Sequence, residues 1–160
     1  MSHRHPPGAR ADYRWFHSMT MQWRDNDAFR HANNTVYLGW FDSTICLWER
    51  IEGELDILDG PYRGLVADLG CRYHRPVAWP DRIAAGLRVS RIGTSSVRYE
   101  VGIFREDEPT ASAEGHFLRV VVDAATGRPV PIPPATCARL SAILVPHGQD
   151  AGHGSRHQGA

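Results

Sequence analysis

The segment TMQWRDNDAFRHANNTVYLGWFD, residues 20–42, carries the strongest structural and chemical signals in this chain. It begins at the end of a strand with alternating side chains. The apolar side chains that share one face of that strand are Met19, Met21 and Trp23. Two carboxylates, Asp25 and Asp27, then stand in a polar turn with His31, and residues 33–35 read Asn-Asn-Thr, residue types that cap helix N-termini. The segment therefore predicts a strand, a polar turn and the first turn of a helix.

The helix that follows contains the most apolar run in the sequence. Residues at i, i+4, i+8 and i+11 share one helical face, and here they are Tyr37, Phe41, Ile45 and Trp48. Other apolar positions fall elsewhere round the helix: Leu38, Trp40 and Leu47. A helix that is apolar on nearly all sides is expected to be buried. The free N–H groups and the positive dipole end at its start favour a developing negative oxygen, so a carboxylate just before it is a chemical signal.

The composition is that of one globular domain. The chain has 160 residues, 42% hydrophobic and 22% charged. Lys plus Arg and Asp plus Glu number 18 each, so the net charge is zero. This balance argues against nucleic acid as a partner, because nucleic-acid-binding domains need a basic surface. No apolar run approaches the about 18 residues that span a bilayer, so no membrane segment is expected.

Targeting signals and cysteine usage indicate the compartment. The N-terminal segment lacks the apolar core of a secretory signal. The three cysteines, Cys46, Cys71 and Cys137, are odd in number and far apart, which predicts neither a disulfide framework nor a zinc site. We therefore expect a cytoplasmic protein.

Period-two alternation predicts four further strands after the helix. They lie at residues 65–75, 82–90, 97–104 and 111–123. The alternation in the last strand shifts near His116 and Phe117, which suggests a bulge there. A short helix over residues 136–144 closes the domain. With sequential hairpins, the pattern predicts an α+β fold, in which a curved antiparallel sheet of about five strands wraps round one long buried helix.

The two ends of the chain differ from the domain in composition. Residues 1–12 and 146–160 are rich in His, Gly, Pro and polar residues, which is typical of disordered tails, and residues 13–145 form the domain. Five of the nine histidines lie in these tails, and solvated tails explain them better than a metal site does. They are His3, His5, His147, His153 and His157.

Asp27 is the leading candidate for chemistry. It suits a general base or a nucleophile at an acyl carbon, and it equally suits a turn carboxylate, since Asp is common just before helices. Asp25, at the strand exit, favours a structural hydrogen bond. His31 suits either a polar turn or a contact to substrate. A metal site of Asp25, Asp27 and His31 is disfavoured, because no further ligand cluster is visible.

The helix start and a later turn offer further candidates. Asn33 and Asn34 are good caps, and the backbone N–H near Asn34 would face whatever lies beside Asp27, as an oxyanion hole requires. The turn Gly93-Thr94-Ser95-Ser96 is explained by a hairpin, but its N–H and hydroxyl groups also suit a pantetheine or phosphate group. The arginines that could assist such a ligand, or simply form a solvated sheet face, are Arg82, Arg88, Arg91 and Arg98.

The run Asp25-x-Asp27-x-x-x-His31-x-Asn33-Asn34-x-x-Tyr37 resembles a known family. It is similar to the hotdog-fold acyl-CoA thioesterases of the 4-hydroxybenzoyl-CoA thioesterase type. Weaker matches extend the resemblance over about residues 17–145: Tyr73-His-Arg-Pro76, Pro80-Asp81, Ile92-Gly-Thr-Ser-Ser96 and residues 123–133. The resemblance implies a helix inside a curved antiparallel sheet.

The resemblance also implies residue roles. Asp27 is similar to the catalytic aspartate of the family, and the Asn34 N–H stands where the family polarises the thioester carbonyl. Tyr37 would line the acyl pocket, and the turn at residues 93–96 falls where the family touches pantetheine and nucleotide. His31 and Asn33 complete the expected substrate-contacting set. Arg30 departs from the family, which usually has glycine there, and would be strained if the position needs a positive φ.

The function implied is hydrolysis of an acyl-CoA thioester to the free acid and CoA. Asp27 would either activate water or attack the carbonyl to form an anhydride, and the sequence leaves both routes open. No metal or redox cofactor is expected. Family members pair as dimers with each site at the subunit interface, so a homodimer, or a homotetramer built from dimers, is the expected assembly.

Two other functions compete with this one. The first is a hotdog hydratase or dehydratase, whose chemistry resembles that of an Asp and a His that work as a pair five residues apart. Here Asp27 and His31 are four apart and Asp25 and His31 are six apart, so the spacing does not fit. A non-catalytic acyl-CoA-binding module is the second alternative, and the presence of Asp27 beside the Asn cap argues against it.

Overall fold

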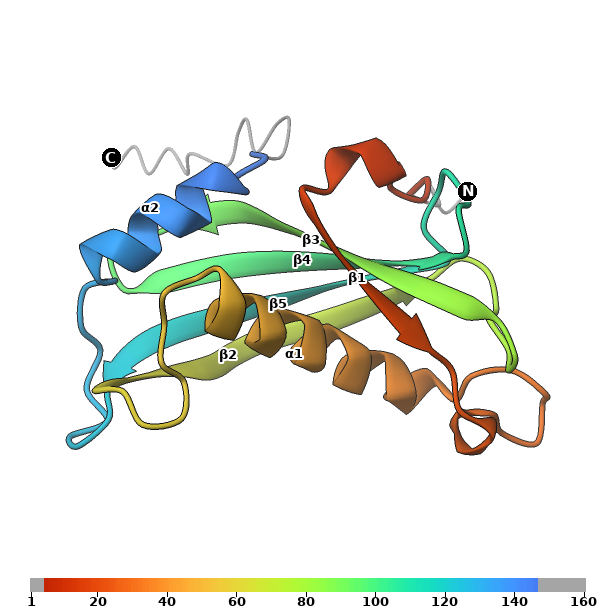
Figure 1. Ribbon diagram of the computed structural model, residues 1–160, viewed down its shortest axis with the longest axis horizontal. Coiled ribbons are helices and arrows are strands. Elements are labelled where there is room, and N and C mark those ends of the chain that lie inside the picture. The colour runs from red at the N-terminus through yellow and green to blue at the C-terminus, as the bar shows by residue number, and fades with distance from the viewer. Residues whose placement is uncertain (1–4, 147–160) are drawn as a thin grey trace, which may run out of the picture.

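The computed structural model describes residues 5–146. In chain order the elements are η1 (Arg10–Asp12), β1 (Trp15–Thr20), η2 (Trp23–Asp25), α1 (Asn34–Ile51), β2 (Tyr62–Tyr73), β3 (Arg82–Ile92), β4 (Ser96–Arg105), β5 (Ala113–Asp123) and α2 (Pro134–Ala142). The five strands form one antiparallel sheet in the order β1-β3-β4-β5-β2. Figure 1 shows the sheet curving round α1, which lies along its concave face. This confirms the expected sheet and helix.

The prediction of sequential hairpins is wrong at one connection. β2 does not pair with β3, its neighbour in sequence, but with β5 at the far edge of the sheet. The reason is that both edges of β3 are already occupied, by β1 on one side and β4 on the other. β2 therefore takes the free edge of β5, and β1 and β2 become the two edge strands.

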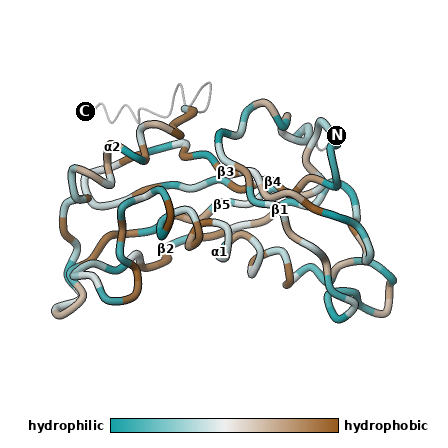
Figure 2. Tube along the Cα trace, viewed as in Figure 1, coloured by the Kyte–Doolittle hydropathy of each residue, from teal (hydrophilic) through white to brown (hydrophobic). Residues whose placement is uncertain are grey.

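Helix α1 packs its predicted stripe against the sheet. Tyr37, Phe41, Ile45 and Trp48 are buried. Phe41 fits because it faces Gly115 of β5, where an added Cβ would lie 2.2 Å from the ring. Figure 2 shows hydrophobic segments concentrated on the strands and α1, with a largely hydrophilic loop before the helix. The outward positions Leu38, Trp40 and Leu47 are only half-buried, so the helix is buried against the sheet and partly open on its outer side in the single chain.

The structure also differs from three predictions of local structure. Trp23 is 72% exposed and does not share a face with Met21, because the strand ends at Thr20 and the chain turns into η2. The β2–β5 register shifts between Val66 and Asp68, opposite Arg119 and Leu118, so the irregularity lies beside Phe117 as expected but its extra residue is on β2 and not on β5. α2 begins at Pro134 rather than at residue 136, because proline is well suited to the first helical position.

The N-terminal segment is more ordered than its composition predicts. The Arg10 N–H donates to the Pro109 carbonyl at 2.8 Å, and the Ala111 N–H donates to the Gly8 carbonyl at 3.0 Å. The buried Tyr13 anchors this segment by packing edge-on against Phe104. The prediction of disorder through residue 12 is therefore wrong for residues 8–12.

Parts of the two predicted tails, residues 1–4 and 147–160, lie outside the described residues, and with them His3, His147, His153 and His157. Within residues 5–146, no helix combines the length and the apolar character that a membrane crossing needs.

Candidate functional site

The loop before α1 is a tight hairpin closed by backbone hydrogen bonds. The Asp27 N–H donates to the His31 carbonyl at 3.0 Å, and the Arg30 N–H donates to the Asp27 carbonyl at 3.0 Å. A β-bridge between Asn26 and Ala32 flanks the loop. This is a three-residue hairpin whose last residue takes a left-handed conformation. That residue is Arg30, with φ of 65°, so the position that has glycine in the resembling family does need a positive φ here.

The Asp27 carboxylate uses its two oxygens differently. Oδ1 accepts the Phe29 N–H at 2.8 Å, which is the hydrogen bond of an Asx turn. Oδ2 lies 3.5 Å from Nδ2 of Asn33, the residue that caps α1. Both interpretations of this aspartate thus have a structural basis. One oxygen holds the turn, and the other faces the start of the helix.

The start of α1 leaves one donor open beside that carboxylate. Asn33 Oδ1 accepts the Thr35 N–H at 3.0 Å, and the Asn33 carbonyl accepts the Val36 N–H at 3.0 Å. The Asn34 N–H, the first of the helix, has no acceptor within residues 5–146. The Tyr73 hydroxyl fixes the same peptide region by donating to the Asn34 carbonyl at 2.7 Å.

Asp25 has the structural position that was expected of it. Its Oδ2 accepts the Gln22 N–H at 2.7 Å, and its carbonyl accepts the Asn33 N–H at 2.8 Å. Asp25 therefore ties the strand exit to the helix cap.

His31 and Tyr37 lie close to this loop but make different contacts. The His31 ring stacks on Phe29, with centroids 6.2 Å apart, and its Nδ1 lies 3.3 Å from the Ala32 carbonyl. Tyr37 is only 2% exposed and packs edge-on against Tyr73 at 5.1 Å, so in one chain it is a core residue rather than the wall of an open pocket. Burial raises the pKa of both tyrosines, which keeps their hydroxyls protonated.

The turn at residues 93–96 lies at the other end of the sheet. The Gly93 N–H donates to the Ser96 carbonyl at 2.7 Å. The Thr94 carbonyl accepts a backbone N–H of the segment after β5, and the Ser95 carbonyl accepts a backbone N–H of β5 itself. The eleven residues of β3 separate this turn from the strand end that adjoins the Asp27 loop, a span of about 35 Å. The structure therefore brings together Asp27, His31, Asn33, Asn34 and Tyr37, but not residues 93–96, within one chain.

No sequence pattern identified the residues of the β2–β3 connection that hold the Asp27 loop in place. The Ala32 N–H donates to the Val77 carbonyl at 2.8 Å, and the Trp79 N–H donates to Asn26 Oδ1 at 3.1 Å. The bond from the Tyr73 hydroxyl to the helix start also carried no local sequence signal, because its two ends are 39 residues apart. In residues 5–146, His, Cys, Asp and Glu form no group of three or more that could hold a metal ion.

Comparison with known proteins places this chain in a family. A family profile described as the thioesterase-like superfamily matches residues 21–140. No curated protein matches the chain. The PA5185 protein from Pseudomonas aeruginosa strain PAO1 is 40% identical, with a TM-score of 0.84 over 87% of this chain and 97% of that one.

Two solved thioesterases are also similar in structure. A thioesterase from Thermus thermophilus, complexed with coenzyme A and Zn, is 26% identical, with a TM-score of 0.68 over 80% of this chain and 92% of that one. The 1,4-dihydroxy-2-naphthoyl-CoA thioesterase Slr0204 from Synechocystis shares the fold at 12% identity, with a TM-score of 0.71 over 79% of this chain and 94% of that one. With its hotdog fold, the chain belongs to the thioesterase-like superfamily and is a thioester hydrolase.

Proposed function

We propose that this protein hydrolyses the thioester of an acyl-coenzyme A to the free acid and coenzyme A. The observation that carries the proposal is the Asp27 carboxylate at the start of α1, with Oδ1 fixed by the Phe29 N–H and Oδ2 toward Asn33. A carboxylate that is oriented through one oxygen keeps the other for proton transfer or attack. The coenzyme A bound to the Thermus thermophilus thioesterase supports CoA as the carrier.

The helix start supplies the electrophilic half of the site. The Asn34 N–H would donate a hydrogen bond to the thioester carbonyl oxygen, and the positive end of the α1 dipole would stabilise the oxyanion as it forms. Either Asp27 removes a proton from water that attacks the carbonyl, or Asp27 attacks and water hydrolyses the resulting anhydride. In both routes the C–S bond breaks and CoA leaves as the thiolate. His31 and Asn33 would contact the substrate near the reacting carbon.

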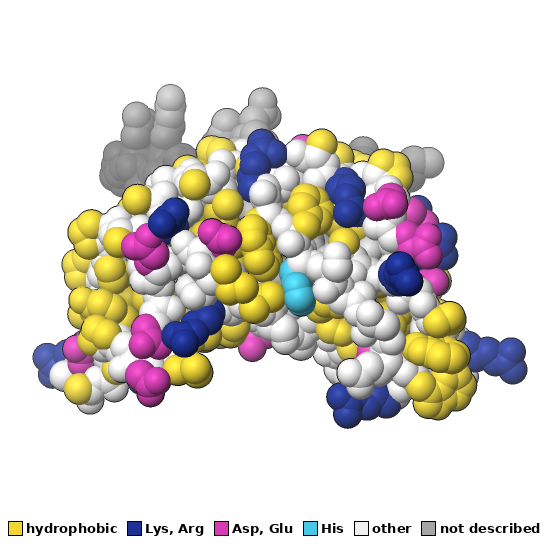
Figure 3. Space-filling model, viewed as in Figure 1, with side chains coloured by type: hydrophobic (Ala, Val, Ile, Leu, Met, Phe, Trp, Pro, Cys, Tyr) yellow, Lys and Arg dark blue, Asp and Glu magenta, His cyan; other side chains and the backbone are white. Residues whose placement is uncertain are grey.

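A second copy of the chain would complete this site. β2 pairs on one edge only and exposes Leu65, Val66, Leu69 and Tyr73. Figure 3 shows hydrophobic side chains reaching the surface on the face that carries α1. An open, apolar strand edge is a ready site for pairing with another chain. A homodimer, alone or within a tetramer, would cover α1 and close an acyl pocket beside the start of that helix. It would also let the turn at residues 93–96 of one copy hold CoA for the other.

Hydrolysis of a panel of CoA thioesters tests the function. We expect steady release of free CoA, measured with a thiol reagent, and no metal added. Water addition to an enoyl-CoA without CoA release would assign the protein to the hydratases instead. Tight binding of acyl-CoA with no turnover would assign it to the binding modules.

Mixed dimers test whether two chains share each site. Asp27→Asn removes the base, and Thr94→Glu places a negative charge on the exposed turn that would repel the CoA phosphates. If one chain supplies Asp27 and the other the turn, subunit exchange between the two inactive variants restores about a quarter of wild-type activity. Mixtures that stay inactive after verified exchange would place both elements of each site on one chain.

A further inference from the structure

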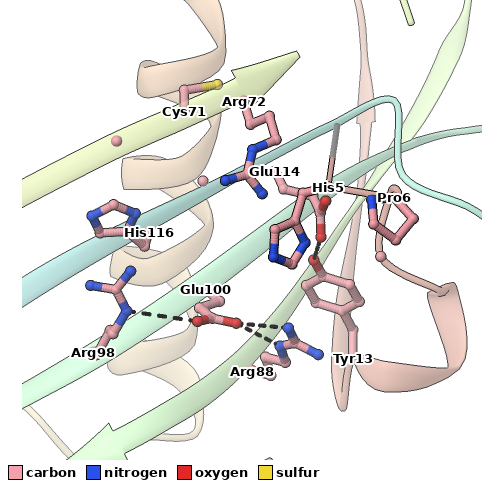
Figure 4. Close-up of a pocket in the computed structure, with 13 residues that line it drawn as sticks. His5, Pro6, Tyr13, Cys71, Arg72, Arg88, Arg98, Glu100, Glu114 and His116 are labelled. Carbon is pink, nitrogen blue, oxygen red and sulfur yellow. Dashed lines mark hydrogen bonds and ion pairs between the residues drawn. The ribbon is translucent and has the colours of Figure 1, made fainter. Parts of the chain in front are cut away.

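A polar cavity of about 430 Å³ lies on the convex face of the sheet, away from the Asp27 loop. The strand register places Arg88, Glu100 and His116 in one row across β3, β4 and β5. Their sequence neighbours Leu87 and Val101 belong to the core that packs against α1, so this row faces the opposite side. The N-terminal segment forms another wall, and Figure 4 shows its His5 and Tyr13 beside the strand residues.

Both carboxylates of the cavity are already engaged. Glu100 Oε2 lies 2.8 Å from Nε and from Nη2 of Arg88. Glu114 accepts the Tyr13 hydroxyl at 3.0 Å and lies 2.7 Å from His74 Nε2. Burial alone would raise the pKa of Glu114, but hydrogen bonds from the Gly8 N–H, His74 and Tyr13 together lower it. Glu114 is therefore an ionised carboxylate with its acceptor positions occupied.

The cations of the cavity are not balanced in the same way. Three guanidinium groups, those of Arg72, Arg88 and Arg98, line it against the two carboxylates. Within residues 5–146, the guanidinium group of Arg72 makes no hydrogen bond and no ion pair. Arg98 has one long ion pair, with its Nε 3.7 Å from Glu100 Oε1. Figure 4 shows Arg72 and Arg98 on different sides of the hollow, which leaves both forks directed at the space between them.

Two imidazoles add further nitrogen donors round the same space. His5 lines the cavity from the N-terminal segment, and His116 lines it from β5, where its Nε2 lies 2.9 Å from Asp68 Oδ2. Gly70 lies against this ring, since a Cβ there would be 2.7 Å from His116 Cε1. The missing side chain at position 70 thus lets His116 stand at the cavity wall.

We infer that this cavity binds a small polyanion that carries phosphate or carboxylate oxygens. Arginine suits such groups because its planar fork donates two parallel hydrogen bonds to them. A cleft lined by an excess of one charge concentrates ions of the other. The volume holds more than one phosphate group and lies in the range of small-molecule sites. Arg72 and Arg98 are the binding residues, with His5 and His116 at the rim.

The site is separate from the thioester chemistry. No residue of the loop at residues 25–34 lines the cavity, and the sheet stands between the cavity and α1. An anion bound here would therefore stabilise the fold and the docked N-terminal segment without competing for the catalytic aspartate.

Calorimetric titration with pyrophosphate and with citrate, at constant ionic strength, tests the proposal. Arg72→Gln removes the unpaired guanidinium, and the matched control Arg50→Gln removes one from the exposed side of α1. We expect Arg72→Gln to weaken binding about tenfold or more, and Arg50→Gln to leave it unchanged. Histidine ring signals of His5 and His116 in NMR spectra should shift on titration of the wild type and not of Arg72→Gln.

The outcomes separate the sources of the anion. Tighter binding of pyrophosphate supports a phosphorylated ligand, and tighter binding of citrate supports a polycarboxylate. The inference is overturned if neither anion binds the wild type at millimolar concentration. Equal binding by the wild type and Arg72→Gln, or equal weakening by Arg72→Gln and Arg50→Gln, would also overturn it, because either result shows no specific role for this cavity.

Discussion

The two ends of helix α1 hold their carboxylates in opposite ways. At the N-terminal end, Asp27 is half-buried, receives a backbone N–H on one oxygen, and has no arginine partner among the described residues. In the C-terminal half, Glu49 is 2% exposed and both oxygens are held. Tyr99 donates to Oε1 at 2.9 Å, and Arg119 donates to Oε2 at 2.6 Å.

The carboxylate in the C-terminal half of α1 belongs to a buried ionic network that perturbs the pKa values of its members. Burial raises the pKa of Glu49, against the opposing pull of Arg119 and Tyr99. Burial would lower the pKa of Arg119, but Glu49, Cys46 and Asp42 raise it, so Arg119 stays a cation. Perturbed groups often mark active sites, but structural ion pairs perturb pKa values too. Here the shifts of Glu49 and Arg119 mark the network that fixes α1 to the sheet, and the proposed site depends on geometry instead.

Replacement of Asp27 by Asn should have the largest effect of any single change on turnover. Asn keeps an acceptor for the Phe29 N–H, so the turn should survive, while the base or nucleophile is lost. We expect kcat to fall by about 10²–10⁴-fold with an unchanged melting temperature. Steady-state kinetics and thermal melts on the same preparation measure both. Turnover near the wild-type rate would remove Asp27 from the mechanism.

The reverse pattern is expected at the other end of the helix. Arg119→Met leaves the Glu49 carboxylate buried without its cation, and breaking a buried pair in this way costs about 3–5 kcal/mol of unfolding free energy. Urea unfolding measures the loss. Turnover per folded molecule should change little.

The double variant Arg119→Met with Glu49→Leu is the control, since removal of both charges should recover most of the stability. If Arg119→Met abolished turnover while the protein stayed folded, the network would belong to the site and the contrast between the two ends would fail.

Local patterns in the sequence predicted one end of α1 far better than the other. The spacing of Tyr37, Phe41, Ile45 and Trp48 identified the buried stripe, because helical period is a local property. The proximity of Asp27 and Asn33 was also predictable, because the two residues are only six apart and belong to one turn and helix cap. The Glu49–Arg119 pair was missed because its partners are 70 residues apart and no short pattern joins them.

Long-range pairing explains the error in strand order. Alternation identified β2 and β5 as strands but carried no information that they pair, so hairpins between sequence neighbours were expected. The family resemblance assigned the turn at residues 93–96 to the substrate site without a position relative to the Asp27 loop. Only the length and direction of β3 show that the two lie at opposite ends of the sheet.

A smaller effect separates the two neighbouring aspartates at the N-terminal end. Asp25→Ala removes the acceptor of the Gln22 N–H, which is the role of a cap. Loss of such a cap costs about 0.5–2 kcal/mol, so we expect a lower melting temperature with most of kcat retained. Alanine is the informative substitution, because asparagine would keep an acceptor. Loss of turnover at an unchanged melting temperature would exchange the roles assigned to Asp25 and Asp27.

The smallest expected effect is a gain in stability at the tip of the same loop. Arg30 has φ of 65°, a conformation that costs a side-chain-bearing residue about 1–3 kcal/mol. Arg30→Gly removes this strain, while the greater freedom of glycine in the unfolded chain offsets about 0.4–1 kcal/mol of the gain. The net gain of about 1 kcal/mol should raise the melting temperature by about 2–4 °C.

Arg24→Gly, at a position without a positive φ, is the control and should lower stability. Because the Asp27–Arg30 hydrogen bond uses backbone atoms alone, Arg30→Gly should leave kcat unchanged. A fall in kcat together with the gain in stability would show that strain at Arg30 helps to hold the Asp27 carboxylate in its reactive position.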